Sequence, residues 1–375
     1  MPGSEERGAD HGGSVRRKSG DDRVLVALSG GVDSSVAALL LKRRGYEVHT
    51  TTFWLWDYPN SPEYRGKENA CCSLDMAGTV ADQLDLPHYR FDLSDEFEAE
   101  VVRPTVRAYL QGITPNPCAR CNRLVRFDLL LEKAKELGFR FIATGHYVRV
   151  EEEDGVQRLL KGLDPEKDQS YFLYGLGQDE LERAVFPVGN FRKDEIYRIA
   201  EEEDLITAEA EESQDLCFVP EGDYREFLER GAPGSMEEGE IVDTDGNVLG
   251  THRGLPFYTI GQRKGLGLES NRAYYVTEMD AENNRLVVGA EEDLYSSGLV
   301  ATEPSWIAGT PPEETEVDVK IRYGAPPVEA RLEVESDEFL VSFEEPQKSV
   351  TPGQIAGVYD GEELLGGGII ESVKP

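Results

Sequence analysis

Residues 24–35, VLVALSGGVDSS, decide how the N-terminal half of the chain folds. Residues 24–28 form a short apolar run, which is typical of a strand buried in a parallel sheet. Ser29, Gly30 and Gly31 follow as a turn, and the apolar residues 36–41 predict the start of a helix. A strand, a glycine turn and a helix N-terminus make an anion site, because free N–H groups and the helix dipole point at one place.

The chemistry of this turn favours a nucleotide. Ser29, Ser34 and Ser35 offer hydroxyl groups, whereas Asp33 would repel a bare phosphate and fits better as a Mg²⁺ ligand or a helix cap. A Walker A loop is excluded, because this turn has no lysine to reach the phosphates. Residues 29–34, SGGVDS, are called the SGGVDS loop from here on. They resemble the PP-loop of ATP pyrophosphatases, which release AMP and pyrophosphate while adenylating a carbonyl oxygen. The alternative is an ordinary serine- and glycine-rich turn.

The first half of the chain alternates between strand and helix patterns. Strands are expected at residues 47–53, 88–93 and 141–144, and helices at 74–84, 95–111 and 124–137. This alternation predicts an α/β fold with a doubly wound parallel sheet. Ligands bind at the carboxyl ends of such strands, where the SGGVDS loop and Thr144-Gly145-His146 are both expected to lie.

The pattern changes from about Asp215. A short helix is expected at 223–230, hairpin turns at 245–246 and 280–284, and strands at 317–323, 329–334, 339–343, 354–359 and 364–370. These strands predict a small C-terminal β-barrel. We therefore expect a disordered tail (1–20), an ATP-binding and catalytic PP-loop domain (21–215), a small central domain (216–295) and a C-terminal β-barrel domain (296–375).

Charge and hydropathy restrict the binding partners and the cellular location expected for this protein. The 375 residues include 73 acidic and 39 basic ones, for a net charge of −34. This acidity either argues against a nucleic-acid partner or forms a solvated coat suited to a high-salt cytoplasm. Basic residues remain clustered at positions 120–126, Arg192-Lys193, His252-Arg253 and Arg263-Lys264, which supports a local anion-binding face. No apolar run is long enough to span a membrane, and the first 20 residues lack the apolar core of a signal peptide. Five cysteines, an odd number, argue for a reducing cytoplasm, so we expect a cytoplasmic protein.

Three of the five cysteines stand in distinctive contexts. Cys118 and Cys121 form a C-x-x-C pair in TPNPCARCN, where two prolines predict a stiff loop and Arg120 and Arg123 favour the thiolate. Cys217 follows in SQDLCF, near the expected domain junction. Zinc would require four ligands in paired spacing, and these cysteines supply three. The adjacent Cys71 and Cys72 are interpreted as structural or peripheral.

Seven motifs occur in the order found in the tRNA-specific 2-thiouridylases: SGGVDSS, TPNPCARCN, ATGHY, KDQSYFL, SQDLCFV, TIGQRKGLGL and TPGQ. The resemblance covers about residues 24–372. It implies that ATP adenylates the C2 carbonyl oxygen of the wobble uridine in the Lys, Glu and Gln tRNAs, with release of pyrophosphate. A persulfide sulfur then displaces AMP. By motif position, Cys217 corresponds to the persulfide cysteine and Cys121 to the catalytic nucleophile, and a cysteine desulfurase or relay protein would supply the sulfur.

The resemblance also assigns binding residues. The ATP contacts would be Ala27, Leu28, Ser29, Gly30, Gly31, Val32, Asp33, Ser34, Phe53 and Gly145. Asn116, Pro117 and Cys118 would hold the target base, and further tRNA contacts would be His146, Lys167, Asp168, Gln169, Arg322, Tyr323 and Gln354. Each has an ordinary alternative: Phe53 and His146 could belong to the core, Lys167 and Asp168 could form a surface ion pair, and Arg322 and Tyr323 could be barrel surface.

Cys118 departs from the family pattern, because many members have Asp at this position. Two routes stay open: a [4Fe–4S] cluster held by Cys118, Cys121 and Cys217 with one open iron position, or a persulfide handled by Cys121 and Cys217 alone. We favour the persulfide route. The alternative functions are a PP-loop adenylating amidotransferase acting on a small molecule and a non-catalytic tRNA-binding protein.

Overall fold

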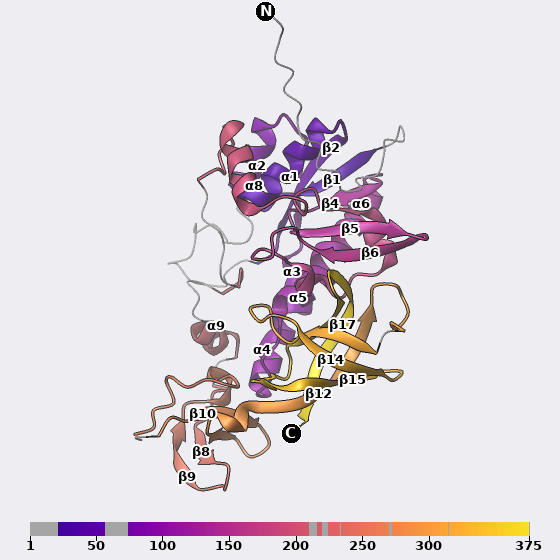
Figure 1. Cartoon of the computed structure of the whole chain (residues 1–375). Helices are drawn as coiled ribbons and strands as arrows, with labels where there is room; N and C mark the ends of the chain where they lie inside the picture. The colour runs from indigo at the N-terminus through magenta and orange to yellow at the C-terminus, as the bar shows by residue number, and fades with distance from the viewer. Residues whose placement is uncertain are drawn as a thin grey trace, which may run out of the picture.

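The computed structural model describes residues 22–56, 74–209, 216–219, 224–232, 234–269, 272–313 and 315–374. The expected tail at 1–20 and the pair Cys71-Cys72 lie outside the described residues. Figure 1 shows a parallel sheet with its helices toward one end of the molecule, and a four-stranded sheet and a barrel toward the other.

The N-terminal sheet has the strand order β3-β2-β1-β4-β7, and all neighbouring strands in it are parallel. Its strands are β1 (Arg23–Ala27), β2 (Glu47–Trp54), β3 (His88–Asp92), β4 (Phe141–Ala143) and β7 (Ala184–Val185). Successive side chains of β1 point to opposite faces. Leu25 packs into one apolar cluster and Val24 and Val26 into another, so both faces of the sheet are covered. The predicted doubly wound sheet is confirmed.

Helices cover the two faces. The helices α1 (Val32–Arg43), α2 (Leu74–Gln83) and α8 (Lys193–Glu202) pack on the face of Val24 and Val26. On the face of Leu25, α6 (Asp128–Glu136) packs against β4. The apolar cluster of Leu25 also includes residues of α3 (Ser94–Phe97), a π-helical stretch (Glu98–Val102), α4 (Arg103–Leu110), α5 (Pro117–Cys121), a second π-helical stretch (Asn122–Phe127) and α7 (Gln178–Arg183).

Two predicted helix starts are wrong. The first helix begins at Val32 rather than Val36, directly after Gly31. The helix expected from residue 124 begins at Pro117, because proline fits the first helical position and Asn116 caps it by accepting a hydrogen bond from Ala119 N at 3.1 Å. Cys118 and Cys121 therefore lie on a helical turn and not in the loop that the two prolines suggested.

The C-terminal strands close into a six-stranded barrel. Its strands are, in order, β12 (Tyr295–Trp306), β15 (Glu338–Lys348), β14 (Val328–Val334), β13 (Glu316–Lys320), β16 (Ile355–Asp360) and β17 (Glu363–Lys374), and β17 pairs back with β12. The sequence patterns missed β12. They also missed the hairpin of β5 (Val148–Glu153) and β6 (Val156–Lys161), which extends the barrel sheet by pairing β6 with β17. The N-terminal half and the barrel therefore share one sheet.

A separate four-stranded sheet has the order β10-β11-β8-β9. It consists of β8 (Gly239–Asp243), β9 (Val248–His252), β10 (Tyr275–Asp280) and β11 (Arg285–Gly289), and α9 (Tyr224–Gly231) precedes it. Both predicted hairpins are present in this sheet. Short 3₁₀ helices span Ser170–Leu173, Leu255–Phe257 and Glu292–Leu294. The domain boundaries proposed above stay predictions. Among the helices in the described ranges, none has the length and apolar character needed to cross a membrane.

Candidate active site

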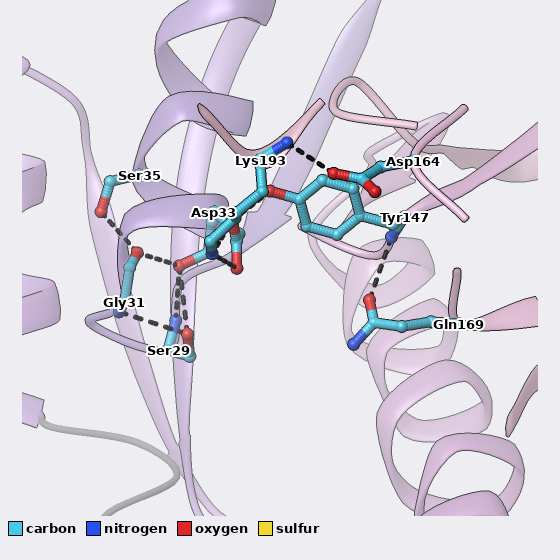
Figure 2. Close-up of polar contacts among 9 residues, drawn as sticks. Ser29, Gly31, Asp33, Ser35, Tyr147, Asp164, Gln169 and Lys193 are labelled. Carbon is cyan, nitrogen blue, oxygen red and sulfur yellow. Dashed lines mark hydrogen bonds and ion pairs between the residues drawn. The ribbon is translucent and has the colours of Figure 1, made fainter. Parts of the chain in front are cut away.

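The SGGVDS loop connects β1 to α1 and is braced by its own serines. Gly30 has a φ of 84°, a left-handed conformation that favours glycine. The Ser34 hydroxyl accepts a hydrogen bond from Ser29 N at 3.1 Å and donates one to Gly31 O at 3.0 Å. Ser35 Oγ also donates to Gly31 O, at 2.9 Å (Figure 2). The serines expected to offer hydroxyl donors to phosphate thus also fix the shape of the loop.

Gly145 lies directly against this loop. A Cβ atom at Gly145 would lie 2.7 Å from Ser34 N and 2.8 Å from the carbonyl carbon of Asp33, so the close approach requires glycine. Because β1 and β4 are parallel neighbours, the segments that follow them meet at one edge of the sheet. The structure therefore brings together the SGGVDS loop and the ATGHY motif, as expected from the sequence.

Asp33 has two partners that the sequence did not suggest. Lys193 Nζ lies 2.7 and 2.9 Å from the two carboxylate oxygens, and the Tyr147 hydroxyl donates to Oδ1 at 2.6 Å (Figure 2). The side chain of Asp33 is 33% exposed and that of Lys193 only 10%. Asp33 was expected to bind Mg²⁺ or to cap the helix, and here its carboxylate is balanced by a lysine from a distant segment.

Phe53 is a core residue in the structure. It is 6% exposed and packs in the same apolar cluster as Leu25, with its ring centroid 6.3 Å from that of Phe91 on the neighbouring strand. This matches the ordinary alternative given for Phe53. Its contact with ATP stays a prediction.

Cys121 and Cys217 share one apolar cluster. Cys121 is buried within this cluster and Cys217 packs against it, while Cys118 is half-buried. Positions 118 and 121 are three residues apart on a helix, so their side chains lie on the same side. Phe218, next to Cys217, packs its ring against Phe97 and Phe227 at centroid distances of 5.6 and 5.2 Å.

The charges near these thiols differ from the expected arrangement. Arg120 donates from its guanidinium to the Glu100 carboxylate at 3.1 Å, and its Nε donates to the Glu100 carbonyl oxygen. The positive charge expected to favour a thiolate is thus balanced by an acid. Burial raises the pKa of Tyr174, and the nearby Arg123 opposes that shift.

Among the described ranges, no three His, Cys, Asp or Glu side chains lie close enough together to hold a metal ion. Cys118, Cys121 and Cys217 all belong to those ranges. In this arrangement the three thiols do not fit a [4Fe–4S] cluster.

Three of the residues assigned to tRNA form internal contacts. His146 is 8% exposed, with Nδ1 2.8 Å from Thr144 Oγ1, and Asp168, 7% exposed, accepts hydrogen bonds from Gly162 N and Ser170 N at 3.1 Å. Gln169 Oε1 accepts a hydrogen bond from Tyr147 N at 3.0 Å (Figure 2). The backbone N–H of Lys167 donates to Asp164 O. A buried Asp168 does not match the surface ion pair that was the ordinary alternative.

The barrel contributes the remaining candidates. Arg322 and Tyr323 are exposed, and the Tyr323 ring centroid lies 4.5 Å from that of Phe172. Lys320 Nζ lies 5.3 Å from the Tyr323 ring, and burial lowers the pKa of Lys320 while the charge of Asp168 raises it. An exposed aromatic ring beside a cation is typical of surfaces on which unpaired bases stack.

Gln354 and Pro117 lie close to the C-x-x-C helix. Gln354 hydrogen-bonds the backbone just before this helix, and Pro117 is its buried first residue.

Family models match the chain over most of its length. A tRNA methyl transferase HUP domain covers residues 22–221, a tRNA methyl transferase PRC-barrel domain covers 225–290, and an aminomethyltransferase β-barrel domain covers 296–370. Among solved structures, the U34-tRNA thiolase NcsA from Methanococcus maripaludis with its [4Fe–4S] cluster is 22% identical, covering 57% of this chain and 69% of that chain, with a TM-score of 0.33.

Curated relatives match at higher identity. The tRNA-specific 2-thiouridylase MnmA of Geotalea uraniireducens is 47% identical over 93% of this chain and 95% of that protein. The tRNA-specific 2-thiouridylase MnmA 1 of Caldanaerobacter subterraneus is 46% identical over 94% and 98%. With this coverage of nearly the whole of both chains, the protein belongs to the tRNA-specific 2-thiouridylase family.

Proposed function

We propose that this protein catalyses the ATP-dependent 2-thiolation of the wobble uridine in the Lys, Glu and Gln tRNAs. The observation that carries the proposal is the family membership over nearly the full length of relatives that bear this name. The SGGVDS loop with its Gly145 contact supports ATP binding, and the cluster shared by Cys121 and Cys217 supports sulfur transfer.

The first step is adenylation. The uridine O2 attacks the α-phosphate of ATP, the bond to the bridging oxygen breaks, and the electron pair leaves with pyrophosphate. The SGGVDS loop and the N-terminus of α1 present backbone N–H groups to the phosphates. The partly exposed Asp33 carboxylate is the kind of oxygen ligand that Mg²⁺ prefers, and the ion would neutralise phosphate charge there.

The second step is sulfur transfer. The terminal sulfur of a persulfide on Cys217 attacks C2 and displaces AMP. The Cys121 thiolate then attacks Sγ of Cys217, so that the sulfur stays on the base and a Cys121–Cys217 disulfide forms. A thiol reductant restores both cysteines before the next turnover. Both cysteines pack at the same large apolar cluster, and the disulfide requires their Cα atoms to come within about 7 Å of each other.

The partners follow from this chemistry. A cysteine desulfurase or a relay protein in the cytoplasm would load Cys217, and tRNA would meet Asn116, Pro117, Cys118 and the exposed pair Arg322-Tyr323. A small-molecule amidotransferase and a non-catalytic tRNA-binding protein are not favoured, because neither would use Cys121 and Cys217.

The test is an incubation of the protein with ATP, a persulfide source and unmodified tRNA. Mass spectrometry of the nucleosides should detect 2-thiouridine, and AMP and pyrophosphate should form in proportion to it. Production of ADP and phosphate, or ATP turnover with no thiolated base, would contradict the proposal.

A further inference from the structure

We propose that Lys193 supplies the phosphate-binding positive charge that the SGGVDS loop lacks, and that Asp33 positions it. This inference deepens the proposed function and rests on its use of ATP. Lys193 is the first residue of α8, 160 positions after Asp33, so no local motif connects the two.

The geometry holds the Lys193 ammonium beside the loop. Its Nζ contacts both oxygens of Asp33 and lies 5.7 and 5.0 Å from the ring centroids of Tyr147 and Tyr197. The backbone N–H of Lys193 donates to Asp164 at 2.9 Å, which fixes the start of α8 (Figure 2). A side chain 10% exposed and held at both ends loses little further freedom when a ligand binds.

The negative charge of Asp33 would oppose phosphate binding unless the Lys193 ammonium balanced it. Asp33 lies in the first turn of α1, where a triphosphate would meet the helix N-terminus. A carboxylate there repels phosphate unless its charge is balanced. If the Asp33 oxygens held Mg²⁺, the Lys193 ammonium would bind a phosphate oxygen in place of the carboxylate. The lysine therefore exchanges one anion for another with little movement.

The contribution to chemistry is electrostatic. As the uridine oxygen bonds to the α-phosphate, negative charge develops on the departing pyrophosphate, and a fixed ammonium nearby stabilises it. No proton leaves the lysine in this step. The same role is played in Walker A loops by a lysine within the loop, which this chain replaces with one from α8.

Binding measured by calorimetry without tRNA tests the inference. Lys193→Gln should weaken binding of Mg·ATP and of Mg·pyrophosphate by about tenfold or more, because a charge-assisted contact is lost. Binding of AMP should change less than about twofold, because the lysine faces the leaving group. The matched control is Arg198→Gln, which removes a positive charge from an exposed side chain of the same helix and should leave all three affinities unchanged. Equal weakening for all ligands, or none, would overturn the proposal.

A second pair of variants keeps the test decisive if Lys193→Gln folds poorly. In EDTA, Asp33→Asn should bind pyrophosphate more tightly than the wild type, because Lys193 is no longer neutralised. Asp33→Asn combined with Lys193→Gln should lose that gain, and persistence of the gain would contradict the inference. If Lys193→Gln selectively loses pyrophosphate binding but the wild type converts ATP to ADP, the proposed function would be refuted and the role of Lys193 would stand. If the wild type forms AMP and Lys193→Gln binds Mg·ATP and Mg·pyrophosphate as tightly as the wild type, only the role of Lys193 would be refuted.

Discussion

The side-chain amide of Gln354 donates hydrogen bonds to the carbonyl oxygens of Thr114, at 3.0 Å, and Pro115, at 3.2 Å. In return, Thr114 N donates to Pro352 O at 3.2 Å. A barrel loop therefore holds the backbone that leads into the Asn116 cap and the C-x-x-C helix. Gly353, with φ of 91°, allows this contact, because a Cβ atom there would lie 2.4 Å from Ile113 Cγ2.

Replacing Gln354 by Glu should therefore slow thiolation. A carboxylate cannot donate to the two carbonyl oxygens, so the backbone before the C-x-x-C helix loses both hydrogen bonds. Because this helix carries Cys121, we expect kcat to fall about tenfold. ATP affinity measured without tRNA should not change. Gln347→Glu, on another barrel strand, is the matched control. A rise in KM for tRNA with unchanged kcat would show instead that Gln354 contacts tRNA, as the family resemblance implies.

Gly145→Ala should weaken ATP binding while the protein stays folded. The added methyl group would lie 2.7 Å from Ser34 N, against backbone that cannot move aside cheaply, so the SGGVDS loop must shift. We expect about a tenfold loss of ATP affinity. Gly324→Ala is the control, because nothing lies within 4 Å of a Cβ atom there. Unchanged affinity in Gly145→Ala would mean that the loop tolerates the shift.

The sequence was informative where local pattern and tertiary position agree. The apolar run at residues 24–28 and the alternation after it predicted the sheet, since a strand buried on both faces needs continuous apolar residues. The start of the C-x-x-C helix was missed because Pro117 was interpreted as a loop residue, although proline also suits the first helical position.

The remaining errors have a different cause. The hairpin of β5 and β6 carries the acidic run 151–154, whose polarity masks its pairing with a strand more than 200 residues away. Lys193 appeared only as half of a basic pair, because its partner Asp33 lies in another segment. Contacts between segments so far apart leave no local pattern from which to predict them.

Acidic pH should destabilise the sheet that contains His252. This side chain is fully buried, with Gly254 N donating to its Nδ1 at 3.0 Å and Nε2 lying 3.1 Å from Asn284 O, an arrangement that suits the neutral ring. Burial lowers its pKa below the ordinary 6.5. The unfolded protein then binds more protons than the folded one below pH 6.5, so stability is complete above that pH and falls as the pH decreases toward the folded pKa.

Thermal unfolding between pH 8 and pH 5 measures this effect. His252→Asn should be less stable at pH 8, where it loses the packing of the ring, and should show a smaller further loss on acidification. An equal dependence on pH in both proteins would assign the effect to other groups.

Cys217→Ser should abolish loading of sulfane sulfur, and Cys121→Ser should abolish its transfer to tRNA. Serine is nearly isosteric but cannot carry sulfane sulfur, and its hydroxyl is not ionised at neutral pH. Both variants should still bind ATP, since each exchanges one sulfur atom for oxygen at the apolar cluster and leaves the residues of the SGGVDS loop unchanged. The measurements are protein-bound persulfide after incubation with a donor, and 2-thiouridine in tRNA. Full thiolation by either variant would remove that cysteine from the mechanism.

Cys118→Asp separates the persulfide route from a cluster. Under the persulfide route Cys118 is a neighbour of Cys121 on one helix face, so the aspartate that the family resemblance implies at this position should retain much of the activity in an aerobic assay. A hard carboxylate is a poor substitute for a thiolate as an iron ligand, so a cluster held by the three cysteines would be lost.

Iron, acid-labile sulfide and thiolation are measured together in the wild type and in the variant, both purified anaerobically. Cys118→Ser serves as the control, because it removes the thiol without introducing a charge. Retained thiolation in an iron-free Cys118→Asp protein supports the persulfide route, whereas the joint loss of iron and activity would establish Cys118 as a cluster ligand.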